Sequence, residues 1–324
     1  MDIASTTPDS LTMEDPCIRA EDAQPTVRFE PVVASSSTET TTFEGFPVRA
    51  RYPPGELRGL VVFFHGSGGS ASFLDRIETR AFVEELLAAD YGSIATESTQ
   101  RDEEMRWSAS PETPNADVER VTRLVRQTLS ERGLAADHPL FLVGMSNGAG
   151  FVGTLAEALS VSDLNLRAVM MQQNPWRRDV FEAGAPTVPT FHVSVANESV
   201  SDLPRARAQV AQAQAENRGP VVDTVAEEVP LDPRRFLRIP GFTEARANAF
   251  FMDLVQRDLI DAAGQRLANV DQLEASFRRT PDGTLSFEEL RDVRSQILVT
   301  WAMHQMRSDY SEQAVAFFEC HRSQ

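Results

Sequence analysis

A serine stands at the centre of the run 144–148, Gly-Met-Ser-Asn-Gly, which follows the apolar run 139–143 directly. This order predicts a strand, a sharp turn and then a helix. A serine at the tip of such a turn has a strained backbone that exposes its oxygen, and the flanking glycines keep other side chains away from it. Ser146 is therefore the candidate nucleophile of an acyl-transfer reaction.

A second apolar run, 60–64, leads into His65 and the flexible Gly- and Ser-rich stretch 66–70. In acyl transfer, the negative oxygen of the tetrahedral intermediate is held by two backbone N–H groups. One follows the nucleophile, and the other comes from the loop after an earlier strand. We expect Asn147 and Ser67 to supply these two donors.

A serine nucleophile needs a base within hydrogen-bond reach, and the chain has five histidines. His65 belongs to the loop just described, His138 precedes the nucleophile strand, and His192 lies inside a predicted strand as a buried structural residue. His304 and His321 remain. We favour His304, which follows apolar residues at helical spacing and looks helix-borne, over His321 at the end of the terminal helix.

The base in turn needs an acid that orients it. Glu198 follows the predicted strand 190–196, so its carboxylate is expected at the same edge of the sheet as Ser146. Asp202, four residues later, is the reserve choice. The predicted triad is thus Ser146, His304 and Glu198.

The elements that must position these residues alternate along the chain. Apolar runs predict strands at 60–64, 92–95, 139–143, 166–171 and 190–196, with antiparallel edge strands inside 42–52. Helical spacing appears within 73–87, 117–129, 151–159 and 311–318. Alternating strands and helices predict an α/β fold with a doubly wound, mostly parallel sheet.

Changes in composition divide the chain. Residues 1–40, rich in Ser, Thr, Pro and acidic side chains, are expected to be mostly disordered, and 41–200 to form the core. Residues 201–300, where Ala, Gln, Arg and Glu dominate, predict a helical insertion that either covers the site as a lid or packs on the sheet edge. Residues 301–324 return to the core with His304 and the last helix.

The net charge of −17, with arginine as the sole basic residue besides histidine, argues against nucleic acid and anionic lipid as partners. It also favours neutral or moderately apolar substrates over anionic ones. No run approaches the roughly 20 apolar residues of a membrane span. The first residues lack the features of a signal peptide, so we expect a cytoplasmic protein unless a leader has been removed.

Two cysteines, Cys17 and Cys320, lie near opposite ends of the chain, and we expect free thiols rather than a bridge. The run 280–289 imitates the end of a calcium loop, but Arg278 stands where calcium requires a carboxylate. Ser286 as the N-cap of a helix, with Glu289 completing a capping box, explains the run better. We therefore expect neither a metal nor a cofactor.

The stretches 64–70, 115–118 and 144–148, together with the order Ser146, Glu198, His304, make the chain resemble the α/β-hydrolases. It is most similar to the branch of polyhydroxyalkanoate depolymerases and feruloyl or acetylxylan esterases. The resemblance covers about 41–200 and the C-terminal helix. That family usually has Asp as the acid and a histidine on a loop after a final strand, so Glu198 and the helix-borne His304 depart from its pattern.

The resemblance and the residues together predict a serine hydrolase that cleaves carboxylic esters, small or polymeric, through an acyl-enzyme. Two alternatives stay open. The first is a catalytically silent member that binds a partner through the helical insertion. The second is an acyltransferase that uses the same serine. The sequence does not predict the oligomeric state.

Overall fold

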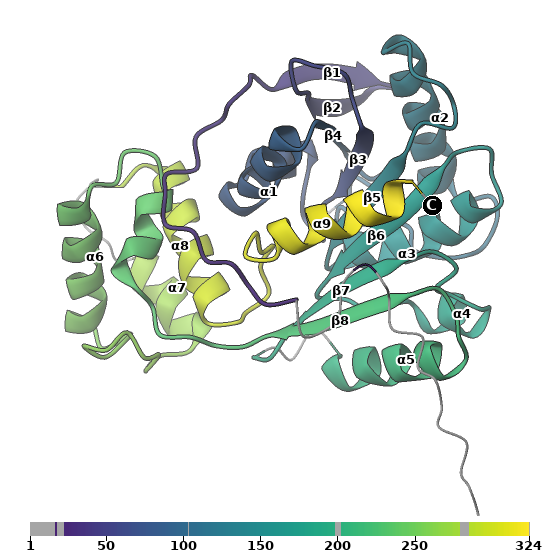
Figure 1. The fold of residues 1–324 in the computed structure, drawn as a ribbon. Coiled ribbons are helices and arrows are strands. Elements are labelled where there is room, and N and C mark those ends of the chain that lie inside the picture. Colours follow the sequence, from purple (N-terminus) through teal and green to yellow (C-terminus); the bar gives the residue numbers. More distant parts are fainter. Residues whose placement is uncertain (1–16, 18–22, 103, 198–201, 279–284, 324) are drawn as a thin grey trace, which may run out of the picture.

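An eight-stranded sheet lies at the centre of the protein in the computed structural model, which describes residues 17, 23–102, 104–197, 202–278 and 285–323 (Figure 1). The strands are β1 (Glu39–Phe43), β2 (Phe46–Arg51), β3 (Gly59–Phe64), β4 (Tyr91–Thr96), β5 (Leu140–Met145), β6 (Leu166–Gln172), β7 (Thr190–Val195) and β8 (Val221–Ala226). They are ordered β1-β2-β4-β3-β5-β6-β7-β8. The β1–β2 and β2–β4 pairs are antiparallel and all other pairs are parallel. The predicted doubly wound, mostly parallel sheet is confirmed.

Helices cover both faces of the sheet. The α-helices are α1 (Ile77–Ala88), α2 (Ala116–Glu131), α3 (Asn147–Ser160), α4 (Arg178–Glu182), α5 (Leu203–Ala215), α6 (Glu244–Gln256), α7 (Val270–Arg278), α8 (Phe287–Thr300) and α9 (Ser311–Arg322). Short 3₁₀ helices in the described part of the chain are η2 (Ala71–Asp75) and η3 (Pro233–Arg238). Figure 1 shows α1 and α9 on one face of the sheet, with α2 and α3 on the other.

The central strands are apolar on both sides because both faces are covered. In β3, Val61 and Phe63 pack in the cluster that includes α1 and α9, whereas Val62 and Phe64 pack in the cluster that includes α2 and α3. All four side chains are fully buried. A continuous apolar run was therefore a sound signal for these strands, although it did not alternate.

The described residues within 227–278 and 285–300 form a separate packing unit beside the sheet. The buried side chains of this unit come chiefly from η3 and α6 to α8, and they include Phe236, Leu254, Leu273 and Ile297. Figure 1 shows α6, α7 and α8 together at one side of the molecule, beyond α1. Among the described residues, no helix is long and apolar enough to cross a membrane.

The structure differs from the sequence expectation at the start of the supposed insertion. Strand β8 belongs to the sheet and runs parallel to β7, with Thr190 opposite Val221, and helix α5 packs on these two strands. The core thus continues past residue 200. The signal for β8 was weak because its six residues contain Asp and Thr and follow a polar, Gln-rich segment.

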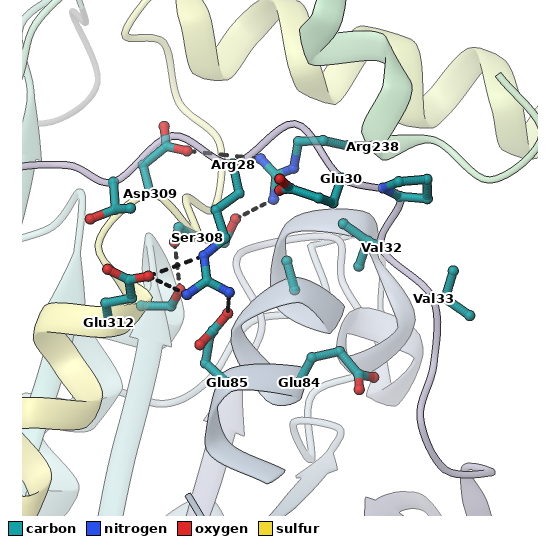
Figure 2. Close-up of a pocket in the computed structure, with 14 residues that line it drawn as sticks. Arg28, Glu30, Val32, Val33, Glu84, Glu85, Arg238, Ser308, Asp309 and Glu312 are labelled. Atoms are coloured by element: carbon teal, nitrogen blue, oxygen red, sulfur yellow. Dashed lines mark hydrogen bonds and ion pairs between the residues drawn. The ribbon is translucent and has the colours of Figure 1, made fainter. Parts of the chain in front are cut away.

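Residues 23–38, expected to be disordered, contact the last part of the chain. The backbone N–H of Thr26 donates to Asp309 (2.6 Å), and that of Val32 donates to Arg238 (2.9 Å). The Arg28 guanidinium lies between Glu85 on α1 and Glu312 on α9 and pairs with both (Figure 2). These partners lie far away in the sequence, so local composition could not reveal them.

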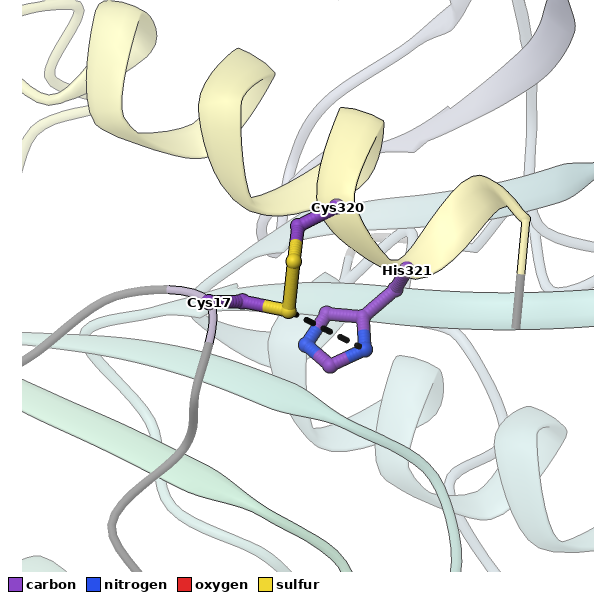
Figure 3. Close-up of a disulfide and its surroundings, with 3 residues drawn as sticks. All are labelled: Cys17, Cys320 and His321. Carbon is purple, nitrogen blue, oxygen red and sulfur yellow. Dashed lines mark hydrogen bonds between the residues drawn. A yellow bond between two sulfur atoms is a disulfide. The ribbon is translucent and has the colours of Figure 1, made fainter.

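Cys17 and Cys320 form a disulfide, so the expectation of free thiols is wrong. Cys320 lies near the end of α9, and the His321 ring is next to the bridge, with Nδ1 4.0 Å from the Cys17 sulfur (Figure 3). The two cysteines are 303 residues apart in sequence. Residues 24–28 contact Glu312 and Gln313 at the start of the same helix, an arrangement that cysteine spacing does not encode.

Candidate active site

Ser146 occupies a sharp turn between β5 and α3. It is the N-cap residue of α3 with φ 58° and ψ −123°, a conformation that non-glycine residues rarely adopt. Its N–H donates to the carbonyl of Gln172 (2.9 Å), and its carbonyl accepts from the Asn174 side chain (3.1 Å). The end of β6 therefore holds the strained turn in place, with Ser146 partly exposed.

The two glycines of the Gly-Met-Ser-Asn-Gly run are required by close backbone packing. A Cβ at Gly144 would lie 2.4 Å from the carbonyl oxygen of Gly148. A Cβ at Gly148 would lie 2.3 Å from the carbonyl oxygen of Phe64 at the end of β3. The motif thus has a steric cause: it lets β5, α3 and β3 approach one another around Ser146.

The loop after β3 lies against the serine, as expected from the sequence. A Cβ at Gly66 would be 3.2 Å from the Cβ of Ser146, so the neighbouring residue Ser67 is close to the turn. Neither Ser67 nor Asn147 donates its backbone N–H to an acceptor within the described part of the chain. Both donors predicted for the oxyanion are therefore adjacent to the nucleophile turn.

His65 supports this loop as a neutral side chain. It is 1% exposed, and burial lowers its pKa to about 4. Its ring packs against Trp107 with centroids 5.1 Å apart, and its backbone carbonyl accepts from the Trp107 indole (3.1 Å). The Asn147 side chain in turn accepts from the Trp107 N–H (2.7 Å), so Trp107 links both sides of the turn.

His304 lies in a bend after α8, which ends at Thr300, and so it is not helix-borne. Its side chain is half-buried. The residues around it are tied to the end of β6: the Gln173 side chain donates to the Gln305 carbonyl, and the Gln172 side chain exchanges two hydrogen bonds with the Arg307 backbone (2.9 and 3.0 Å). Gln172 also accepts from the Ser146 N–H. Ser146 and His304 therefore lie at the same end of the parallel strands, which is the edge of the sheet predicted for the site.

Buried charges hold the same bend from the other side. Glu78 on α1 is fully buried and accepts from Arg238 (3.0 Å), from Gln296 (2.7 Å) and from the N–H and hydroxyl of Ser308 (2.8 and 2.6 Å). The arginines and the Ser308 bonds outweigh desolvation and lower the pKa of Glu78 to about 2. Arg235 pairs with Asp309 at 2.8 Å. The bend is thus fixed by side chains from α1, η3 and α8.

The predicted acid Glu198 lies outside the described residues. Asn197, just before it, donates its N–H to the Ala302 carbonyl (3.3 Å) and its amide to the Trp301 carbonyl (3.2 Å). The chain leading to Glu198 therefore contacts the turn leading to His304. The reserve acid Asp202 is exposed and caps α5, accepting from the Arg205 N–H at 3.1 Å.

The other histidines are used structurally. His321 is 2% exposed and packs on Phe317 near the end of α9. This end of α9 reaches the start of β4, where Tyr91 donates to Glu319, so His321 lies at the opposite edge of the sheet from Ser146. His192 is buried in β7 and bonds Asp223 at 2.7 Å, as expected of a structural histidine. His138 is partly buried just before β5.

Sequence reasoning missed several polar residues at the site edge. Gln172 and Gln173 carry the bonds that join the two halves of the site, yet they end an ordinary apolar strand. Glu228, two residues after β8, accepts from the Asn197 side chain and pairs with Arg266 at 2.8 Å. None of these residues belongs to a local motif, so no signal could have singled them out.

Within the described ranges, no group of three or more His, Cys, Asp or Glu side chains is arranged to hold a metal ion. The calcium-loop-like run lies partly outside these ranges. Its described end has the predicted capping box: the Ser286 N–H donates to the Glu289 carboxylate (2.7 Å), and the Glu289 N–H donates to the Ser286 hydroxyl (3.2 Å). The capping interpretation is confirmed.

Comparison with known proteins gives matches by structure but not by sequence. No family model matches the chain, and no curated protein matches it. Among solved structures, a thermostable esterase is similar with 19% identity and a TM-score of 0.45, over 59% of this chain and 54% of that one. A carboxylesterase from Mesorhizobium loti is similar with 19% identity and a TM-score of 0.45, over 63% of this chain and 97% of that one. An arylesterase is similar with 15% identity and a TM-score of 0.45, over 64% of this chain and 79% of that one.

Proposed function

We propose that the protein is a serine hydrolase that cleaves carboxylic esters through an acyl-enzyme. Ser146 is the nucleophile, His304 the base and Glu198 the acid, with the N–H groups of Ser67 and Asn147 as the oxyanion hole. The observation that carries this proposal is the backbone of Ser146, with φ 58° at a strand-to-helix turn packed against the Gly66–Ser67 loop. Strain of this kind persists where function requires it.

The proposed reaction uses these residues in turn. His304 accepts the Ser146 proton as the hydroxyl oxygen attacks the ester carbonyl carbon, and the oxyanion receives the two N–H groups. His304 then donates the proton to the departing alcohol, which leaves an acyl-serine. A water molecule attacks in the same way and releases the acid. None of these steps requires a cofactor.

The decisive experiment is labelling with a fluorophosphonate probe, read by mass spectrometry. The proposal expects one adduct, on Ser146, and its loss in the Ser146→Ala variant together with all hydrolysis of 4-nitrophenyl acetate. Ser10→Ala, in the first residues of the chain, serves as the matched control. A native, folded protein without any adduct would overturn the proposal and favour the silent binding protein.

Acyl transfer to an alcohol remains the second use of the same serine. Product analysis with added alcohols separates the two, because a transferase forms a new ester faster than free acid. The polyhydroxyalkanoate depolymerase and feruloyl esterase branch stays a prediction, tested by assaying those substrates. The cytoplasmic location also stays a prediction, and the Cys17–Cys320 bridge argues for an oxidising compartment instead.

A further inference from the structure

A cavity of about 240 Å³ opens beside the nucleophile turn. One wall is made by Gly66, Ser67 and Met145, the residues that surround Ser146. The opposite wall is made by the start of α1 and by one side of α8. A substrate bound at Ser146 through its ester group would therefore extend part of its structure into this cavity.

The charge of the cavity is opposite to that of the protein. In a chain of net charge −17, three arginines line it, Arg76, Arg291 and Arg294, against Asp292 as the one lining carboxylate among the described residues. Arg294 pairs with Glu274 on α7, outside the lining, and Arg291 pairs with Asp292 at 3.2 Å.

Arg76 is left over. It has no ion pair with any residue that the structure describes, and it is partly buried at the N-cap of α1. Burial and the neighbouring Arg291 lower its pKa, whereas Asp292 alone raises it. A guanidinium that is partly desolvated and faces another arginine gains most from an added anion, because such a group removes the repulsion.

Two residues that line the cavity also carry a buried polar atom without a hydrogen-bond partner. Ser295 is 6% exposed and its hydroxyl is buried without a hydrogen bond, and His65, 1% exposed, has an unpartnered Nε2. Both residues line the cavity.

We propose that this cavity binds a carboxylate carried by the ester substrate, with Arg76 and Arg291 as its principal partners. The inference rests on the proposed function and narrows its substrate class to esters that bear a free acid, either in the acyl chain or in the alcohol. Arginine holds a carboxylate through two parallel N–H bonds, which fixes the substrate as well as attracting it. The expectation from net charge, a preference for neutral esters, is thereby reversed at the site itself.

The test compares isosteric pairs of esters in which a carboxylate is replaced by an isopropyl group. The acyl pair is 4-nitrophenyl hydrogen glutarate and 4-nitrophenyl 5-methylhexanoate, and the alcohol pair is 4-acetoxybutyrate and 4-methylpentyl acetate. For at least one pair, kcat/KM of the wild type is expected to favour the acid about tenfold or more. Arg76→Met and Arg291→Met should each lower that preference about tenfold, and rising salt should weaken it. Arg126→Met, an exposed arginine paired with Asp163, should leave it unchanged.

The outcomes separate the two proposals. If Ser146→Ala abolishes hydrolysis but the acid preference is absent in both pairs or unchanged in both arginine variants, the carboxylate site is overturned and the hydrolase stands. If the wild type cleaves none of the four esters and takes no fluorophosphonate label, both fall. Thermal melting of each variant confirms that it is folded, and the use of two arginines guards against one that does not fold.

Discussion

The two halves of the candidate site are built by different means. The turn at Ser146 is positioned by backbone packing, with glycines where a Cβ would lie 2.3–2.4 Å from a carbonyl oxygen. The bend at His304 is positioned by buried side chains: Glu78, the Arg235–Asp309 pair and the Gln172 amide. A site made from close backbone contacts leaves its mark in a short sequence motif, whereas one made from distant charges does not.

The largest expected effect is on the turn at Ser146, the half of the site that backbone packing positions. Gly148→Ala places a methyl group against the Phe64 carbonyl, and neither backbone can yield, so we expect a loss of about 4 kcal/mol or more in unfolding free energy, or no folded protein. Gly55→Ala is the control, since a Cβ there meets nothing within 4 Å. Urea unfolding measures both. Equal stability of the two variants would contradict the steric account of the motif.

The second prediction concerns the base. His304→Ala should lower kcat by about 10³-fold or more, because a serine without its base is a poor nucleophile. His321→Ala, at the opposite edge of the sheet, should change kcat less than threefold, although it is buried and some stability is lost. Steady-state kinetics with 4-nitrophenyl acetate decides. A larger kcat loss in His321→Ala would show that the base is misassigned.

The third prediction tests the charged half. Glu78→Gln leaves Arg238 buried without its carboxylate and should cost about 3 kcal/mol of unfolding free energy. The folded pKa of Glu78, about 2, is below its ordinary value of 4.5, so its stabilisation is complete above pH 4.5 and is lost as pH falls through 2. The difference between wild type and variant should therefore shrink over that range.

Glu182→Gln, at an exposed position, is the control for this comparison and should leave the unfolding free energy nearly unchanged. Denaturant unfolding at several pH values provides the measurement. A constant difference between wild type and Glu78→Gln from pH 6 to pH 2 would refute the role given to the ionised carboxylate.

The smallest expected effect concerns the disulfide. Denatured protein without reductant should show no free thiol in a colorimetric titration, and Cys320→Ser should show one. The double variant Cys17→Ser/Cys320→Ser should lose about 2 kcal/mol of unfolding free energy, since the cross-link restricts the unfolded chain. Its kcat should equal that of the wild type because the bridge lies away from the Ser146 edge. If two free thiols were found in the untreated wild type, the disulfide would be absent and the prediction wrong.

The sequence predicted what local pattern can encode. The parallel strands, the turn at Ser146 and the loop of Ser67 follow from apolar runs joined to glycines, and the capping box of α8 follows from Ser286 and Glu289. Each of these signals spans ten residues or fewer, and its cause is steric or capping chemistry within that span.

What the sequence did not predict depends on contacts between distant residues. Strand β8 forms because β7 offers an open edge, not because its own six residues read strongly as a strand. The Arg28 ion pairs, the Cys17–Cys320 bridge and the arginine-lined cavity each join segments that lie far apart in the sequence. Net charge is likewise an average over the whole chain, and it says nothing about the charge of a single pocket.

The contacts of residues 17–32 set the order in which the protein can mature. Thr26 and Arg28 bind Asp309 and Glu312, and Cys17 binds Cys320, so these contacts form only after residues 309–320 have left the ribosome. Domains usually begin to fold from the N-terminus during synthesis. Here the first described segment is among the last to dock. A chain that is still being synthesised lacks both the contacts of residues 17–32 and the bend that carries His304.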